Sequence, residues 1–118
     1  MSKLLTLAAA AALGCVLAGS ALASGDALAG KAKAAQVCAA CHSADGSKPT
    51  TPDYPILAGQ YSDYLVEALQ DYKSGKRKNA IMNGMAAGLS DTDIDNLAAW
   101  FSSQSSALHT PVVPLHFE

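Results

Sequence analysis

The sequence has little of the material that usually builds a hydrophobic core. Aromatic residues make up only 6% of the 118 residues, and much of the hydrophobic half of the chain is alanine. Large apolar side chains are the ones that fill protein interiors, so this composition offers a thin core. A chain of this length allows one small domain, and such domains often depend on a staple or a bound cofactor.

Cysteine is also scarce, and of the three cysteines only Cys38 and Cys41 have the Cys-x-x-Cys spacing. A structural zinc site needs four ligands, and the only further candidates are His109 and His116 near the C-terminus. A thioredoxin-like redox disulfide belongs to a βαβ pattern, and the sequence has no convincing strand. Both readings of the cysteine pair are therefore disfavoured.

His42 directly follows the pair and completes the sequence Cys-Ala-Ala-Cys-His, the attachment pattern of c-type haem. Two thiols three positions apart can each add to a vinyl group at one edge of the porphyrin. The adjacent histidine can then bind the iron through an imidazole nitrogen. The sequence therefore predicts one covalently attached haem c, held by Cys38, Cys41 and His42.

Residues 1–23 have the pattern of a secretory signal peptide. Lys3 supplies the positive charge, an apolar run follows, and residues 21–23 fit the Ala-x-Ala cleavage site. The run is short for a membrane span. We therefore expect export to the periplasm and a mature chain that begins at Ser24 and has no membrane span. Cys15 leaves a lipid-anchored protein as the minor alternative.

Helical patterns account for most of the remaining chain. Asp26 is expected to cap the first helix and Gly75 to close the second. Ser90 and Asp93 approximate a capping box at the start of the last helix. The expected helices are residues 26–41, 62–74 and 90–105.

Two of these helices carry apolar residues at helical spacing, and we expect both faces to pack in the core. On the second helix the face consists of Tyr61, Tyr64, Leu65, Ala68, Leu69 and Tyr72. On the last helix it consists of Ile94, Leu97, Ala98 and Phe101. Inside the first helix, Gly30 has small neighbours, which predicts a close backbone approach by another element.

Residues 43–60 are irregular, with three prolines and two glycines. A loop of this length in a compact domain tends to be functional or to wrap a ligand, so we expect it to wrap one haem edge. The carbonyl of Pro55 is expected to accept a hydrogen bond from the imidazole nitrogen of His42 that does not bind iron. An ordinary rigid turn is the alternative.

Two methionines, Met82 and Met85, lie within residues 79–89. A thioether is a soft iron ligand, and a Met/His pair raises the reduction potential of a haem. Either methionine could supply this ligand, while the other fills space in the core.

Four basic residues lie at the C-terminal end of the second helix and directly after it: Lys73, Lys76, Arg77 and Lys78. They could cap the helix dipole and solvate the turn, since cations are favourable at a helix C-terminus. The alternative is a docking patch for an acidic partner.

The chain resembles the bacterial class I c-type cytochromes with a single haem, and especially one half of the two-haem periplasmic cytochromes c. The resemblance lies in three segments, residues 38–42, 55–60 and 82–104. It implies an all-α, class I cytochrome c fold, with three to five helices wrapped around the haem in residues 24–105. Residues 106–118 would form an extended tail. The first helix would cross the last near Gly30 and Trp100.

The resemblance also implies the axial ligands. They would be His42 and Met82, because the ligand of the family lies seven positions before a leucine that corresponds to Leu89. Met85 is the runner-up. With both axial positions filled, the iron has no open place for a substrate, which favours electron transfer over oxygen or peroxide chemistry.

We therefore expect a periplasmic electron carrier and not an enzyme. It would act as a monomer between redox proteins such as a respiratory complex, an oxidase or a dehydrogenase, and would not bind nucleic acid. One alternative is a cytochrome subunit of a dehydrogenase or oxidase complex. A less favoured alternative is a haem enzyme or gas sensor in which Met82 is displaced.

Overall fold

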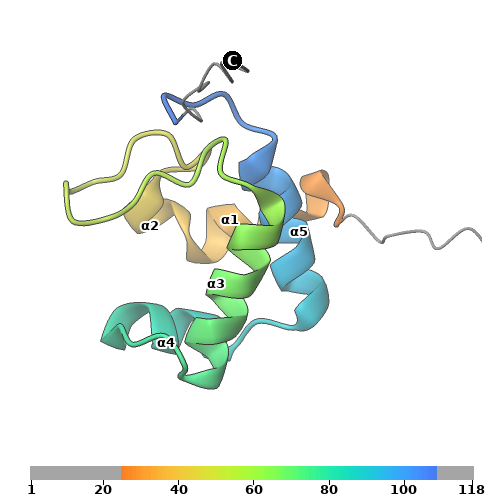
Figure 1. Ribbon diagram of the computed structural model, residues 1–118. Helices are drawn as coiled ribbons and strands as arrows, with labels where there is room; N and C mark the ends of the chain where they lie inside the picture. The colour runs from red at the N-terminus through yellow and green to blue at the C-terminus, as the bar shows by residue number, and fades with distance from the viewer. Residues whose placement is uncertain (1–24, 109–118) are drawn as a thin grey trace, which may run out of the picture.

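The computed structural model describes residues 25–108, which form helices and no strand (Figure 1). This confirms the all-α prediction with its three to five helices. The expected signal peptide, Cys15, His109, His116 and most of the expected tail lie outside the described residues. The helices are α1 (Ala27–Val37), α2 (Ala39–His42), α3 (Ser62–Ser74), α4 (Ala80–Ala87) and α5 (Asp91–Ser102).

The most extensive contact between the described helices is the crossing of α1 and α5. Gly30 is buried there, and a Cβ at this position would collide with the backbone carbonyl of Asn96 and lie 2.9 Å from the Cβ of Trp100. The predicted close approach at Gly30 is therefore confirmed. Asp26 fixes the start of α1 with three hydrogen bonds. Its side chain accepts from the amides of Leu28 and Ala29, and its own amide donates to Asn96 Oδ1 at 2.6 Å.

The core lies where α5 packs against α1 and α3. All four residues of the predicted α5 face are buried, and the largest side chains that are fully buried are Ile94 and Leu97. The interior is therefore as thin as the composition indicated. The core residues are Ala34, Leu65, Ala86, Leu89, Ile94, Leu97, Ala98 and Phe101.

The predicted helix ends are confirmed where a cap is strong. Gly75 ends α3 in the left-handed region with φ of 79°, and Ser90 and Asp93 form a complete capping box on α5. Other boundaries differ. The first helix is interrupted at Cys38, and α5 ends at Ser102, where the side chains after it donate hydrogen bonds to the Trp100 carbonyl. These side-chain bonds compete with further helix formation.

The sequence did not lead us to expect α4, which follows α3 after a short connection (Figure 1). Asn79 caps this helix by accepting hydrogen bonds from the amides of Ile81 and Met82. The helix is only eight residues long and contains Gly84, a residue that weakens a helical pattern. The local signal was therefore the cap at Asn79 alone.

Candidate functional site

A cavity of about 410 Å³ opens between the motif at the end of α1 and α2, the 53–60 segment, α3, α4 and the buried face of α5. Most of the side chains that line it are apolar. The structure brings every predicted site residue to this cavity. Those residues are Cys38, Cys41, His42, Pro55, Met82 and Met85.

Cys38 and Cys41 are unpaired and half-buried. Burial raises the pKa of the Cys38 thiol to about 11, so this thiol is protonated at neutral pH. Reactive cysteines of redox Cys-x-x-Cys motifs have lowered pKa values instead. The environment of Cys38 therefore disfavours thiol-disulfide exchange.

His42 is buried, with 6% of its surface exposed. Its Nδ1 lies 3.0 Å from the carbonyl oxygen of Pro55, which is the contact predicted from the sequence. A carbonyl oxygen only accepts hydrogen bonds, so Nδ1 is the donor in this contact, and in the neutral imidazole Nε2 is then the nitrogen with a lone pair. This bond fixes both the tautomer and the orientation of a ring that can bind a metal through Nε2.

Hydrogen bonds hold the 43–60 loop in the position that this contact requires. The amide of Thr50 donates to the Cys41 carbonyl at 2.9 Å, and the Gly46 carbonyl accepts two amides from further along the loop. On the other side, Trp100 Nε1 donates to the Ala44 carbonyl at 3.0 Å. The loop is therefore joined both to the cysteine motif and to α5.

The two methionines lie one turn apart on α4 and both line the cavity. Met85 is 49% exposed, whereas Met82 is half-buried. Met82 is thus the more enclosed of the two thioethers.

The apolar face of α3 is turned mainly toward the cavity. The prediction that it lies in the core is wrong for Tyr61 and Tyr64, which are 61% and 46% exposed, and right for Leu65, which is buried. Sequence periodicity shows which face is apolar but not whether protein or a ligand covers it. The residues of this face that line the cavity are Tyr64, Leu65, Ala68, Leu69 and Tyr72.

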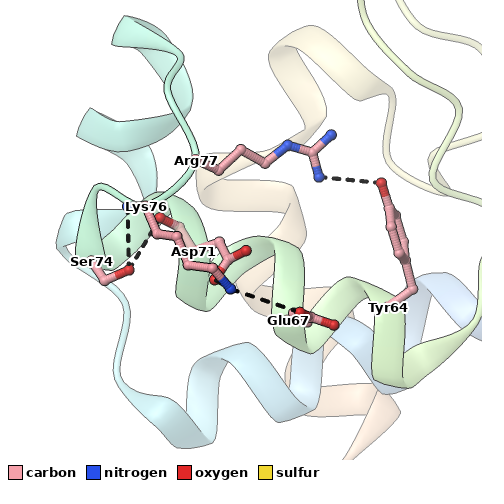
Figure 2. Close-up of polar contacts among 6 residues, drawn as sticks. All are labelled: Tyr64, Glu67, Asp71, Ser74, Lys76 and Arg77. Atoms are coloured by element: carbon pink, nitrogen blue, oxygen red, sulfur yellow. Dashed lines mark hydrogen bonds and ion pairs between the residues drawn. The ribbon is translucent and has the colours of Figure 1, made fainter.

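Two of the three lysines in this basic cluster, Lys73 in the last turn of α3 and Lys76 just after it, pair with acidic side chains of the same chain. Lys73 lies 3.1 Å from Asp91. Lys76 lies 3.1 Å from Asp71 and 4.0 Å from Glu67 (Figure 2). These ion pairs favour the structural reading of the basic cluster over a docking patch.

The Arg77 side chain points away from these ion pairs and toward Tyr64. Sequence reasoning did not identify Arg77 as a site residue. Its guanidinium donates a hydrogen bond to the Tyr64 hydroxyl at 3.2 Å (Figure 2). It also lies 5.0 Å from the centre of the Tyr72 ring. All three residues line the cavity. The one signal in the sequence was an arginine among lysines, because a planar guanidinium can bind a carboxylate with two hydrogen bonds and an ammonium group cannot.

The arrangement of residues 25–108 also bears on metal binding and on membrane insertion. No group of three or more His, Cys, Asp or Glu side chains in this part of the chain is arranged to hold a metal ion. None of its helices is long and apolar enough to cross a membrane.

The cytochrome c family model matches residues 27–105. The chain belongs to the cytochrome c family. With one Cys-x-x-Cys-His motif in the sequence, this membership implies one covalently bound haem c. The cavity fits such a group, because an apolar wall surrounds two thiols, one thioether-bearing helix and one oriented imidazole.

The relatives include cytochrome c4 of Pseudomonas aeruginosa, which is 50% identical over 92 residues, or 78% of this chain and 45% of its own. Cytochrome c-554(548) of Halomonas halodenitrificans is 47% identical over 68% of this chain and 98% of its own. The thiosulfate dehydrogenase electron acceptor of Stutzerimonas stutzeri is 44% identical over 56% of this chain and 31% of its own.

Among solved structures, reduced recombinant cytochrome c4 from Pseudomonas stutzeri matches with a TM-score of 0.65 and 45% identity. The match covers 71% of this chain and 48% of that chain. It confirms the predicted class I cytochrome c fold. The chain spans about half the length of the cytochrome c4 relatives, so the predicted similarity to one half of a two-haem cytochrome is also confirmed.

Proposed function

We propose that this protein carries single electrons between redox proteins in the periplasm, on a haem c ligated by histidine and methionine. The observation that carries the proposal is the arrangement of Cys38, Cys41, His42 and Met82 around one apolar cavity. When bound, the haem supplies the one-electron couple between Fe(II) and Fe(III).

Each residue has a defined role in this proposal. The sulfurs of Cys38 and Cys41 would form the thioether bonds to the haem, and Nε2 of His42 and the thioether of Met82 would be the two protein ligands of the iron. The Pro55 carbonyl holds the imidazole in the tautomer that leaves Nε2 available, as supported by its 3.0 Å contact with Nδ1. The greater enclosure of Met82 supports it over Met85 as the ligand.

Arg77 and Tyr64 extend the proposed site to the polar edge of the haem. No carboxylate of residues 25–108 lies within ion-pair distance of Arg77, whereas Lys73 and Lys76 both have one. A guanidinium and a phenol at the rim of the cavity are suitable donors for a carboxylate of the haem.

With His42 and Met82 both bound to the iron, no coordination position would remain for a substrate, which favours an electron carrier over an enzyme. Exposed apolar side chains at the mouth of the cavity, such as Val37, Ile81 and Met85, offer a small surface that a redox partner can contact. A small interface of this kind suits brief redox encounters.

The likeness to a thiosulfate dehydrogenase electron acceptor favours a second candidate, a cytochrome subunit or dedicated acceptor of a dehydrogenase.

The test is the visible spectrum of the full chain produced in a host that attaches c-type haem. We expect a sharp α-band in the reduced protein and a weak far-red band in the oxidised protein. Met82→Ala should abolish the far-red band, whereas Met85→Ala, the matched control, should keep it. A colourless protein would refute the haem reading, and a high-spin spectrum with rapid carbon monoxide binding would favour a ligand-binding haem protein instead.

Export is tested on the same preparation. Mass spectrometry of periplasmic protein should find a mature chain that begins at Ser24. An acylated chain beginning at Cys15 would instead support the lipid-anchored alternative.

A further inference from the structure

Asn83, the neighbour of Met82 on α4, uses its whole side-chain amide to join α4 to the chain before it. Its Nδ2 donates hydrogen bonds to the carbonyls of Tyr72 at 2.6 Å and Arg77 at 2.8 Å. Its Oδ1 accepts a hydrogen bond from the amide of Asn79 at 2.8 Å. One side chain therefore contacts the last turn of α3, the connection after it and the cap of α4.

These bonds matter because α4 has few other attachments. Among the helices it packs substantially only against α3, and Ala86 is its one buried residue. A helix of eight residues is marginal on its own, so its position is set by what it contacts. The Tyr72 carbonyl lies in the last turn of α3, where it accepts a hydrogen bond from the Gly75 amide at 3.2 Å, and Asn83 supplies a second donor.

We propose that Asn83 is a positioning residue for Met82. Its amide holds α4 against the end of α3 and thereby holds the methionine sulfur in place at the iron. The inference rests on the proposed ligation by Met82. Without the amide, α4 can move away from α3 more readily, so the methionine is displaced more easily while the thioether bonds and His42 keep the haem attached.

A merely structural role would lower overall stability without favouring displacement of the methionine. Asn96 provides a matched control for this distinction. Its Oδ1 accepts a hydrogen bond from the amide of Asp26 at the crossing of α1 and α5. Asn96→Ala therefore also removes an asparagine that bridges two elements, but one away from α4.

The experiment titrates the oxidised holoprotein with imidazole, which competes with methionine for the iron, and follows the far-red band. In Asn83→Ala the apparent dissociation constant for imidazole should fall about tenfold, or about 1.4 kcal/mol. This is the net value of about one hydrogen bond, less than three because two of the three bonds of Asn83 are exposed, where water can replace them. Asn96→Ala should unfold at lower urea than the wild type and keep the wild-type affinity for imidazole. Asn83→Asp keeps the acceptor but loses both donors, and it should behave like Asn83→Ala.

The outcomes separate this inference from the function on which it rests. A wild-type protein without the far-red band would refute ligation by Met82, and the inference with it. A band in the wild type, with unchanged imidazole affinity in both Asn83 variants, would refute only the role of Asn83. Failure of both variants to yield holoprotein would mean that the amide is needed for the fold as a whole, which also contradicts a positioning role.

Discussion

Replacing Gly30 by alanine tests the close crossing of α1 and α5 on which the core depends. The added Cβ would collide with the carbonyl of Asn96 and lie 2.9 Å from the Cβ of Trp100. Neither atom can rotate away, since one belongs to the backbone and the other is fixed to it. The two helices must therefore separate, although Gly30 lies in a helix where alanine is otherwise the better residue.

The magnitude follows from these two opposing effects. Overpacking a tight contact costs about 1–3 kcal/mol, and the contact with backbone places Gly30→Ala at the upper end. The higher helix propensity of alanine offsets about 1 kcal/mol of this cost. We therefore expect the free energy of unfolding to fall by about 2 kcal/mol, which lowers the Tm of a domain of this size by about 8–16 °C.

The measurement is thermal and urea unfolding of the oxidised holoprotein, followed by circular dichroism. Gly84 provides the matched control, because it lies inside α4 with no atom within 4 Å of an added Cβ. Gly84→Ala should raise the free energy of unfolding by about 0.5–1 kcal/mol. Equal stabilisation by both substitutions would refute the argument that contact at Gly30 holds α1 and α5 at this distance.

Three further predictions concern single side chains. Arg77→Gln should lower the reduction potential in a redox titration by on the order of 20–40 mV, because it removes a positive charge that disfavours Fe(III); Lys76→Gln, whose cation is already paired, should leave it unchanged. The pKa of the Asp93 carboxyl is lowered, chiefly by the hydrogen bond from the backbone amide of Ser90. The Asp93 carboxylate therefore stabilises the fold at neutral pH, and this stabilisation is lost as the pH falls through the lowered pKa of the folded state. In urea unfolding, Asp93→Asn should have a lower free energy of unfolding than the wild type at neutral pH, and this difference should shrink below about pH 4. A difference that stays the same at low pH would contradict the lowered pKa. Trp100→Phe should lower the free energy of unfolding by about 1 kcal/mol through loss of one hydrogen bond to the 43–60 loop, with the haem spectrum intact.

Sequence patterns were sufficient where the cause of a structure is local. The caps at Asp26, Gly75 and Ser90 were predictable because a capping residue acts on amides or carbonyls within one turn. The contact of His42 with Pro55 was predictable for a different reason. A metal-binding histidine needs an acceptor for its second nitrogen, and the loop after the motif offered a carbonyl near at hand.

The remaining features depend on contacts that the sequence does not display. The direction of Arg77 is set by Tyr64, thirteen positions earlier, and the bridge made by Asn83 is set by carbonyls of α3 and the connection. Likewise, Tyr64 and Leu65 belong to one apolar face by periodicity, yet one lies at the rim of the cavity and the other in the core. Such partners are determined by how α3 and α4 pack, which is a tertiary property.

The thin core and the site are two aspects of one structure. Six of the eight core residues also line the cavity, so the wall of the site is the interior of the protein. Those six are Leu65, Ala86, Leu89, Leu97, Ala98 and Phe101. A haem bound in the cavity covers apolar side chains that no other part of the protein covers, and burial of this apolar surface stabilises the fold. This accounts for a sequence so poor in aromatic residues: part of the bulk that fills the interior comes from the cofactor and not from side chains.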